Sequence, residues 1–180
     1  MTKLSEIVVS LLIIGTATST QSWQDIIGEA RGVEAKLIIS TINKIQQPFY
    51  VENQRFASTL EELSLGIPRE TENFEYKVFA LDQQQAKVTA KAKQPGSKSY
   101  TGSIFVVKNN QLEETITVAI CETQQASQTP PKMPQAPQLS GQEIKCPPGS
   151  KQLNAKVSFP VENDRTGLLK QFFSTKPGST

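Results

Sequence analysis

Residues 26–45 read I-I-G-E-A-R-G-V-E-A-K-L-I-I-S-T-I-N-K-I, and this stretch decides the fold. Apolar residues recur every three or four positions, which is the period of an amphipathic helix. The stripe consists of Ile26, Ala30, Val33, Leu37, Thr41 and Ile45, widened by Ile27, Ile38, Ile42 and Phe49. The helical pattern runs from Trp23 to about Asn53, and Pro48 is expected to kink the helix or end it one turn later. We expect this stripe to form the core contact of a long helix.

After the helix the apolar period changes to two, which indicates strands. The strand patterns lie at residues 74–79, 86–93, 104–107 and 116–120. A capping box at Thr59 and Glu62 predicts a short helix before them. The links between the strand patterns are short and turn-like, which favours an antiparallel meander over parallel crossovers. We therefore predict an α+β fold in which the long N-terminal helix packs on a four-stranded antiparallel meander, with Lys, Glu and Thr facing water on the other side.

The composition excludes most chemistry. The chain has 180 residues, no His and two Cys, so an imidazole base, a zinc cage and an iron–sulfur cluster are excluded. No acidic calcium-loop motif is present, and Glu61 and Glu62 are adjacent rather than convergent. We predict no enzyme activity, no catalytic residue, no metal site and no cofactor. The net charge is only +2, and Lys87, Lys91 and Lys93 have few aromatic neighbours in sequence, so no nucleic-acid partner is predicted.

The two cysteines flank a segment of different composition. Residues 122–148 are rich in Gln, Pro, Ser and Thr and should form an extended loop. Cys121 precedes this loop and Cys146 lies near its end. In an exported chain such a pair is most simply a disulfide, whose loop closure would contribute about 3.5 kcal/mol. Two free buried thiols are the alternative. Beyond the loop, the alternation at residues 155–159 would suit an added edge strand.

The N-terminus carries the most apolar run, I-V-V-S-L-L-I-I at Ile7–Ile14, preceded by Lys3. The run is shorter than the roughly 20 apolar residues of a regular membrane-spanning helix. One interpretation is a signal peptide cleaved near Ala17 or Ser19. The other is a retained, marginal anchor that continues into the long helix. Glu6 favours the anchor, because a carboxylate at the edge of an apolar run needs a partner cation, such as the α-amino group of a neighbouring chain.

These patterns divide the chain into three parts. Residues 1–22 form a hydrophobic export or anchor segment, residues 23–150 form the globular domain, and residues 151–180 form a C-terminal extension. Both interpretations of the first part imply export from the cytoplasm.

Several separate segments resemble the bacterial type IV pilin-like proteins of the G/H group. The resemblance rests on residues 34–67, from E-A-K-L-I-I-S-T-I to L-S-L-G-I, and on T-E-N-F-E-Y-K-V at residues 71–78. The stretches I-C-E at 120–122 and K-C-P-P-G-S at 145–150 are similar to the disulfide region of that group. Glu6 falls on the family's fifth mature residue if Thr2 stands for the first. The family's leader glycine has no counterpart in this sequence, which leaves an upstream start and another export route as alternatives.

The resemblance implies assembly rather than chemistry. A pilin or pseudopilin, here a minor one, anchors in the inner membrane through its N-terminal segment, with its head in the periplasm. It then joins other pilin-like subunits in a type IV pilus or a type II secretion filament. Glu6 would pair with a neighbour's N-terminal amine and set the axial register. The alternative function is a soluble periplasmic or secreted domain of unknown binding function, released by signal-peptide cleavage.

Overall fold

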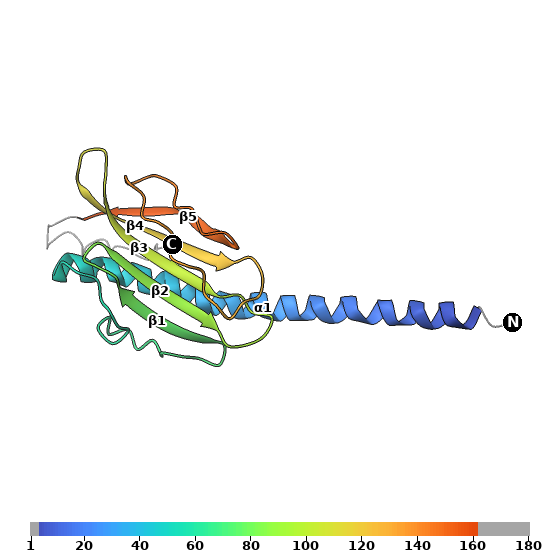
Figure 1. Cartoon of the computed structure of the whole chain (residues 1–180). Helices are drawn as coiled ribbons and strands as arrows, with labels where there is room; N and C mark the ends of the chain where they lie inside the picture. The colour runs from blue at the N-terminus through green and yellow to red at the C-terminus, as the bar shows by residue number, and fades with distance from the viewer. Residues whose placement is uncertain (1–3, 162–180) are drawn as a thin grey trace, which may run out of the picture.

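A computed structural model describes the backbone of residues 4–161 and the side chains of residues 23–153 and 161. The first element, α1 (Leu4–Asn53), is one continuous helix whose C-terminal half lies across a sheet (Figure 1). Pro48 lies inside α1, and the helix ends about one turn later, as the sequence predicts. Gln54 follows with a positive φ of 54°, which turns the chain away from the helix axis.

The sheet is an antiparallel meander in the order β1-β2-β3-β4-β5. Its strands are β1 (Phe74–Ala80), β2 (Gln85–Ala92), β3 (Tyr100–Lys108), β4 (Glu114–Thr123) and β5 (Ser150–Pro160). The predicted helix on an antiparallel meander is confirmed, but the sheet has five strands rather than four. The fifth strand contains the alternating residues 155–159 and pairs with β4, where the register shifts between Val118 and Ile120.

The phase of the predicted helix stripe is wrong in its first half only, because Ile42 is buried as expected and Ile38, Ile45 and Phe49 pack against the core. Ile26, Val33 and Leu37 were expected in the core but are exposed, with 66% of Leu37 accessible to solvent. The face that contacts the sheet is a second stripe, two positions away, which we call the inner stripe. The inner stripe consists of Gly28, Gly32, Ala35, Ile39, Ile42 and Gln46. Ile39 and Ile42 are fully buried against the apolar face of the sheet.

Small residues lead the inner stripe because the helix and the sheet approach closely. A Cβ at Gly28 would overlap the backbone carbonyl oxygen of Gly96, and a Cβ at Gly32 would overlap the Tyr100 hydroxyl. The approach is equally tight from the sheet, where a Cβ at Gly102 would lie 2.6 Å from Cγ2 of Ile39. The glycines that weaken the helix are therefore the residues that let it settle on the sheet.

The predicted short helix after α1 does not form. Residues 60–64 make consecutive turns, although the Glu62 amide does donate to the Thr59 hydroxyl oxygen at 3.3 Å as in a capping box. The Glu62 carboxylate accepts hydrogen bonds from Arg55 at 2.8 Å and from the Ser58 hydroxyl, and no helix follows. Gly66 has the expected left-handed conformation, with a φ of 63°.

The outer face of the sheet, away from α1, is only partly open to water. Residues 124–149 cross it over β3 and β4, and the disulfide between Cys121 and Cys146 holds their end. Ile144 is buried with Phe105 and Val107 in a small second core. The prediction that this face carries polar side chains to water is therefore wrong for β3 and β4. It holds for β1 and β2.

Candidate functional site

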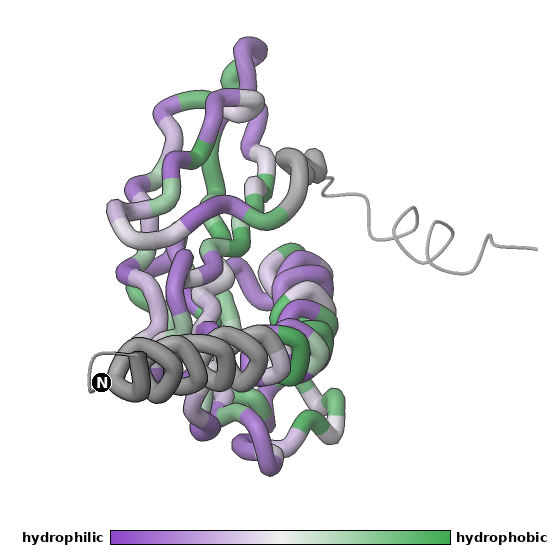
Figure 2. Tube along the Cα trace, turned by 90° about the vertical axis from the view of Figure 1, so that its right-hand side faces the viewer, coloured by the Kyte–Doolittle hydropathy of each residue, from purple (hydrophilic) through white to green (hydrophobic). Residues whose placement is uncertain are grey.

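Most of the large hydrophobic side chains that are exposed in the described structure lie in an apolar stripe along α1. We call it the outer stripe. It consists of Trp23, Ile26, Ile27, Ala30, Val33 and Leu37. Trp23, Val33 and Leu37 each expose more than 60% of their surface. Figure 2 looks along the helix from its N-terminal end and shows hydrophobic residues recurring along its described turns. Contiguous exposed apolar residues of this kind mark interaction sites more often than chance.

Polar contacts along the flanks of α1 determine which face of the helix turns outward. The Glu34 carboxylate accepts hydrogen bonds from Thr71 Oγ1 at 2.5 Å, from Asn73 Nδ2 at 2.9 Å and from the Tyr76 hydroxyl at 2.9 Å. Partial burial raises the pKa of Glu34, but the hydrogen bonds from Asn73, Thr71 and Tyr76 outweigh it, so the pKa lies below its usual value. An ionised Glu34 thus clamps the helix to the start of β1.

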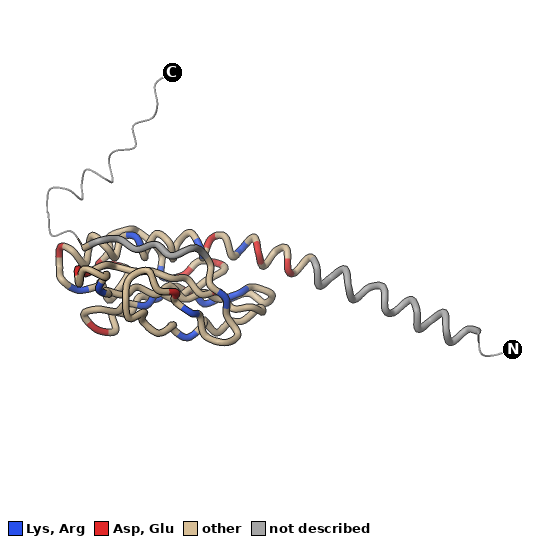
Figure 3. Tube along the Cα trace, turned by 90° about the horizontal axis from the view of Figure 1, so that it is seen from above, with Lys and Arg blue, Asp and Glu red and all other residues tan. Residues whose placement is uncertain are grey.

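A second clamp joins α1 to the C-terminal end of β4. Glu122 on β4 is 1% exposed, and Lys36, Lys98 and Lys151 place their ammonium nitrogens 3.7, 3.7 and 3.0 Å from its carboxylate oxygens. Lys98 also donates to Glu29 of α1 at 2.9 Å. Figure 3 shows basic and acidic positions both along the described part of α1 and over the sheet. Because the buried carboxylate is paired on several sides, its burial is tolerated.

The outer stripe has the properties of a helix-packing surface. Its residues lie three or four positions apart, so they fall on one side of the helix. Their removal from water on contact with another apolar helix would be favourable at about 25 cal/mol per Å². The six side chains of the outer stripe carry no charge, and the carboxylate of Glu34 beside them is bonded to the sheet edge.

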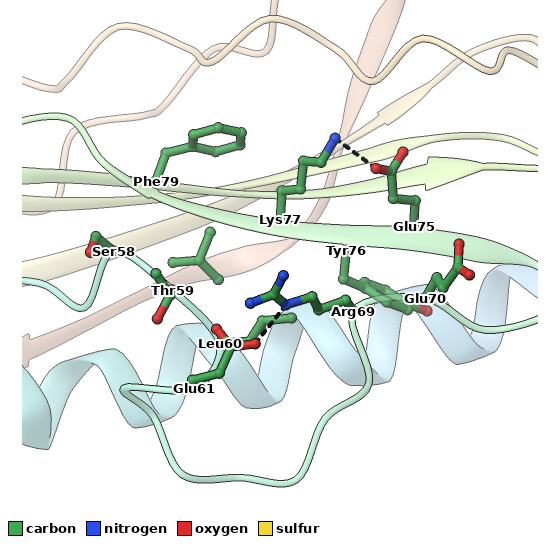
Figure 4. A pocket seen from close by; sticks show the side chains of 11 residues that line it. Ser58, Thr59, Leu60, Glu61, Arg69, Glu70, Glu75, Tyr76, Lys77 and Phe79 are labelled. Carbon is green, nitrogen blue, oxygen red and sulfur yellow. Dashed lines mark hydrogen bonds and ion pairs between the residues drawn. The ribbon is translucent and has the colours of Figure 1, made fainter.

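No chemical site competes with this surface in the part of the chain that the structure describes. The hollow beside the edge of β1 has a volume of about 450 Å³, and Figure 4 shows its lining. Its charged groups already have partners: Arg69 Nε contacts Glu61 at 2.7 Å, Lys77 contacts Glu75 at 2.6 Å, and Glu70 contacts Lys93 outside the hollow at 3.4 Å. Among the described residues, no group of three or more His, Cys, Asp or Glu is arranged to hold a metal ion.

The predicted site residues have different outcomes. Cys121 and Cys146 are joined in a disulfide, with their Cα atoms 5.7 Å apart. Glu6 lies on α1, but its side chain is outside the described residues, so its pairing stays a prediction. Within the described residues, no helix is both long and apolar enough to cross a bilayer. The sequence did contain the outer stripe, but its apolar pattern alone cannot say which of two stripes faces the sheet.

One of the comparisons with known proteins agrees with this geometry. The model of the family described as type IV pilin-like G and H matches residues 32–147, which covers the second half of α1, the first four strands and the disulfide-closed segment. Neither the curated proteins nor the solved structures gave a match. The family match extends over well over half of the chain. A long helix laid on an antiparallel meander, a disulfide that closes the loop after it, and the sequence match lead to one conclusion: the chain belongs to the type IV pilin-like G and H family.

Proposed function

We propose that this protein is a non-enzymatic pilin-like subunit that packs against other pilin-like subunits through the outer stripe of α1. The observation that carries the proposal is the exposure of Trp23, Val33 and Leu37 on the face turned away from the sheet. The clamps at Glu34 and Glu122 fix that face outward, so the surface is preformed and contact requires little reordering.

The proposal has a membrane part. Residues 1–22 would hold the subunit in the inner membrane, residues 23–150 would form the periplasmic head, and residues 151–180 would form an extension. The subunit would then join a type IV pilus or a type II secretion filament as a minor pilin or pseudopilin. Glu6 would set the axial register by pairing with a neighbour's N-terminal amine. A soluble domain released by cleavage is the second candidate, favoured by the small residues 15–19 after the apolar run.

The test compares filament incorporation of four full-length variants in cells. Val33→Asp and Leu37→Asp place a charge on the outer stripe and should deplete the subunit from sheared filaments several-fold. Gln24→Asp is the matched control, because Gln24 is exposed on α1 outside the outer stripe and the substitution adds the same single charge. Glu6→Ala tests the register role. Equal incorporation of all four variants and the parent would reject the proposal.

The start of the mature protein distinguishes a cleaved soluble domain from the anchored subunit. Mass spectrometry of the isolated protein would find a start near residue 18 or 20 if a signal peptide is removed. An intact apolar segment in the membrane fraction, lost on deletion of residues 7–14, supports the anchored subunit instead.

A further inference from the structure

The outer face of β1 and β2 forms the floor of an open groove of about 340 Å³, on the opposite side of the sheet from α1. We call it the lysine groove. It is lined by Glu75, Lys77, Phe79, Lys87, Thr89, Lys91, Pro130, Pro131 and Lys132. The first six residues alternate outward along the two paired strands, and the last three form a wall beside β2.

The groove is positively charged. Four ammonium groups line it against one carboxylate, that of Glu75, whose oxygen already lies 2.6 Å from Lys77 Nζ. Lys91 and Lys132 form no ion pair with any residue of the described chain, whereas Lys36 and Lys98 on the helix side both have acidic partners. Lys87 has only the ring of Phe79, with its nitrogen 4.6 Å from the centroid. The four lysines and one carboxylate leave the groove with a surplus of three positive charges that faces solvent, where it attracts anions.

The wall of the groove is fixed in place. The Thr101 hydroxyl of β3 donates to the carbonyl oxygen of Pro131 at 2.6 Å. Met133, next along the same segment, packs against the small core around Phe105, and the disulfide closes the segment at its end. A groove with a preformed wall loses little conformational entropy when it binds an extended chain.

We propose that the lysine groove binds a linear acidic polysaccharide, one that carries carboxylates at regular intervals. The positive groups are spread rather than clustered: Lys87 and Lys91 lie four residues apart on one strand, about 13 Å along it. This spacing is longer than a single small anion can bridge, and it suits a polymer that carries charges along several consecutive units. The rings of Pro130 and Pro131 supply small apolar surfaces against which the C–H faces of sugar rings can lie.

Nucleic acid fits the groove less well. Single-stranded nucleic acid needs free aromatic faces on which bases stack. Phe79 is the one aromatic residue of the lining, and one of its faces is occupied by Lys87.

The test titrates full-length protein in neutral detergent with fluorescently labelled polygalacturonate. We expect binding that weakens steeply with added salt, because screening reduces the attraction. The pair Lys87→Glu and Lys91→Glu should weaken binding by at least about tenfold, equivalent to about 1.4 kcal/mol. Lys132→Glu should weaken it several-fold without any effect on folding, because Lys132 is exposed and makes no contact through its ammonium group.

The matched control is the pair Lys108→Glu and Lys145→Glu, which makes the same change in net charge at exposed positions outside the groove. It should leave affinity nearly unchanged. Absence of binding, equal binding of neutral dextran, or an equal loss in the control pair would overturn the proposal. Tighter binding of labelled poly(dT) than of polygalacturonate would overturn it in favour of nucleic acid. Because the groove and the outer stripe lie on opposite sides of the sheet, the result is independent of filament assembly.

Discussion

The Tyr76 hydroxyl donates a 2.9 Å hydrogen bond to the carboxylate of Glu34 and so joins the middle of β1 to α1. Thr71 and Asn73 donate to the same carboxylate from the loop before the strand. Three donors around one ion make Glu34 the main polar contact between the helix and the edge of the sheet. The clamp lies two turns from Gly28 and one turn from Leu37, so it sets the rotation of the helix that exposes the outer stripe.

Glu34→Gln should destabilise the fold in a pH-dependent way. At about pH 7 the loss should be about 1–2 kcal/mol, because the amide nitrogen of Gln faces a donor where the carboxylate accepted one. Since the pKa of Glu34 is lower in the folded protein than its usual 4.5, its contribution is fully present above that value. The contribution disappears as the pH falls through the folded-state pKa. Denaturant titrations of parent and variant across this range should therefore converge in acid. A constant difference at all pH values would contradict the prediction.

Truncating a side chain to Ala should destabilise the fold strongly in the inner stripe of α1 and very little in the outer stripe. Ile39→Ala removes a fully buried side chain and should lower the free energy of unfolding by about 2–5 kcal/mol. Leu37→Ala should change it by less than about 0.5 kcal/mol, because the side chain is 66% exposed. Thermal and denaturant unfolding of the two variants makes the comparison. A large loss at Leu37 would place the outer stripe in the core after all.

This helix shows what a single sequence can and cannot predict. The period of 3.6 is visible in residues 26–45, and it predicts a helix correctly. Two apolar stripes share the period, however, and the larger side chains of the outer one favoured the wrong choice. Which stripe faces the sheet is decided by how closely the helix backbone approaches the sheet, which the sequence does not show. The backbone of Gly96 lies so close to Gly28 that only the stripe led by glycine fits against the sheet.

The sheet was predictable where its signals are local. Alternation at residues 74–79 and 86–93 predicted β1 and β2, and short links predicted their antiparallel pairing. What covers the outer face was not predictable, since a Gln- and Pro-rich segment carries no period that shows where it packs. Only Ile144 in that segment is a large, fully buried aliphatic residue. The lysine groove also depends on this packing, because its wall comes from residues 130–132.

Gly28→Ala should destabilise the protein even though alanine favours helices by about 1 kcal/mol over glycine. The added methyl group meets the backbone carbonyl of Gly96, which cannot rotate away as a flexible side chain would. We expect a net loss of about 1–3 kcal/mol, as for other overpacked sites. Ala30→Gly, at an exposed helix position, is the control and should cost only about 1 kcal/mol through propensity. A more stable Gly28→Ala variant would show that helix and sheet are not in close contact.

Glu122→Gln should lower the free energy of unfolding by about 3 kcal/mol, because it leaves the lysines around a buried site without their counter-charge. Lys36 and Lys98 both lie 3.7 Å from the carboxylate, and Lys151 lies at 3.0 Å. Lys151→Met should cost much less, since Lys151 is exposed and the two other lysines still pair with Glu122. Denaturant unfolding of the two variants at low and high salt measures the difference. Equal costs would mean that the exposed lysine alone carries the interaction.

Replacing both Cys121 and Cys146 by Ser should cost about 3.5 kcal/mol, the loop-closure entropy of a segment of this length. The loss should be smaller if the segment stays on the sheet without its covalent link, since Ile144 and Met133 still bury their side chains beneath it. Hydrogen exchange of residues 124–145 in the double variant should rise throughout the segment if the disulfide is its main restraint. Exchange confined to residues near position 146, together with a loss below about 1 kcal/mol, would mean that packing alone holds the segment.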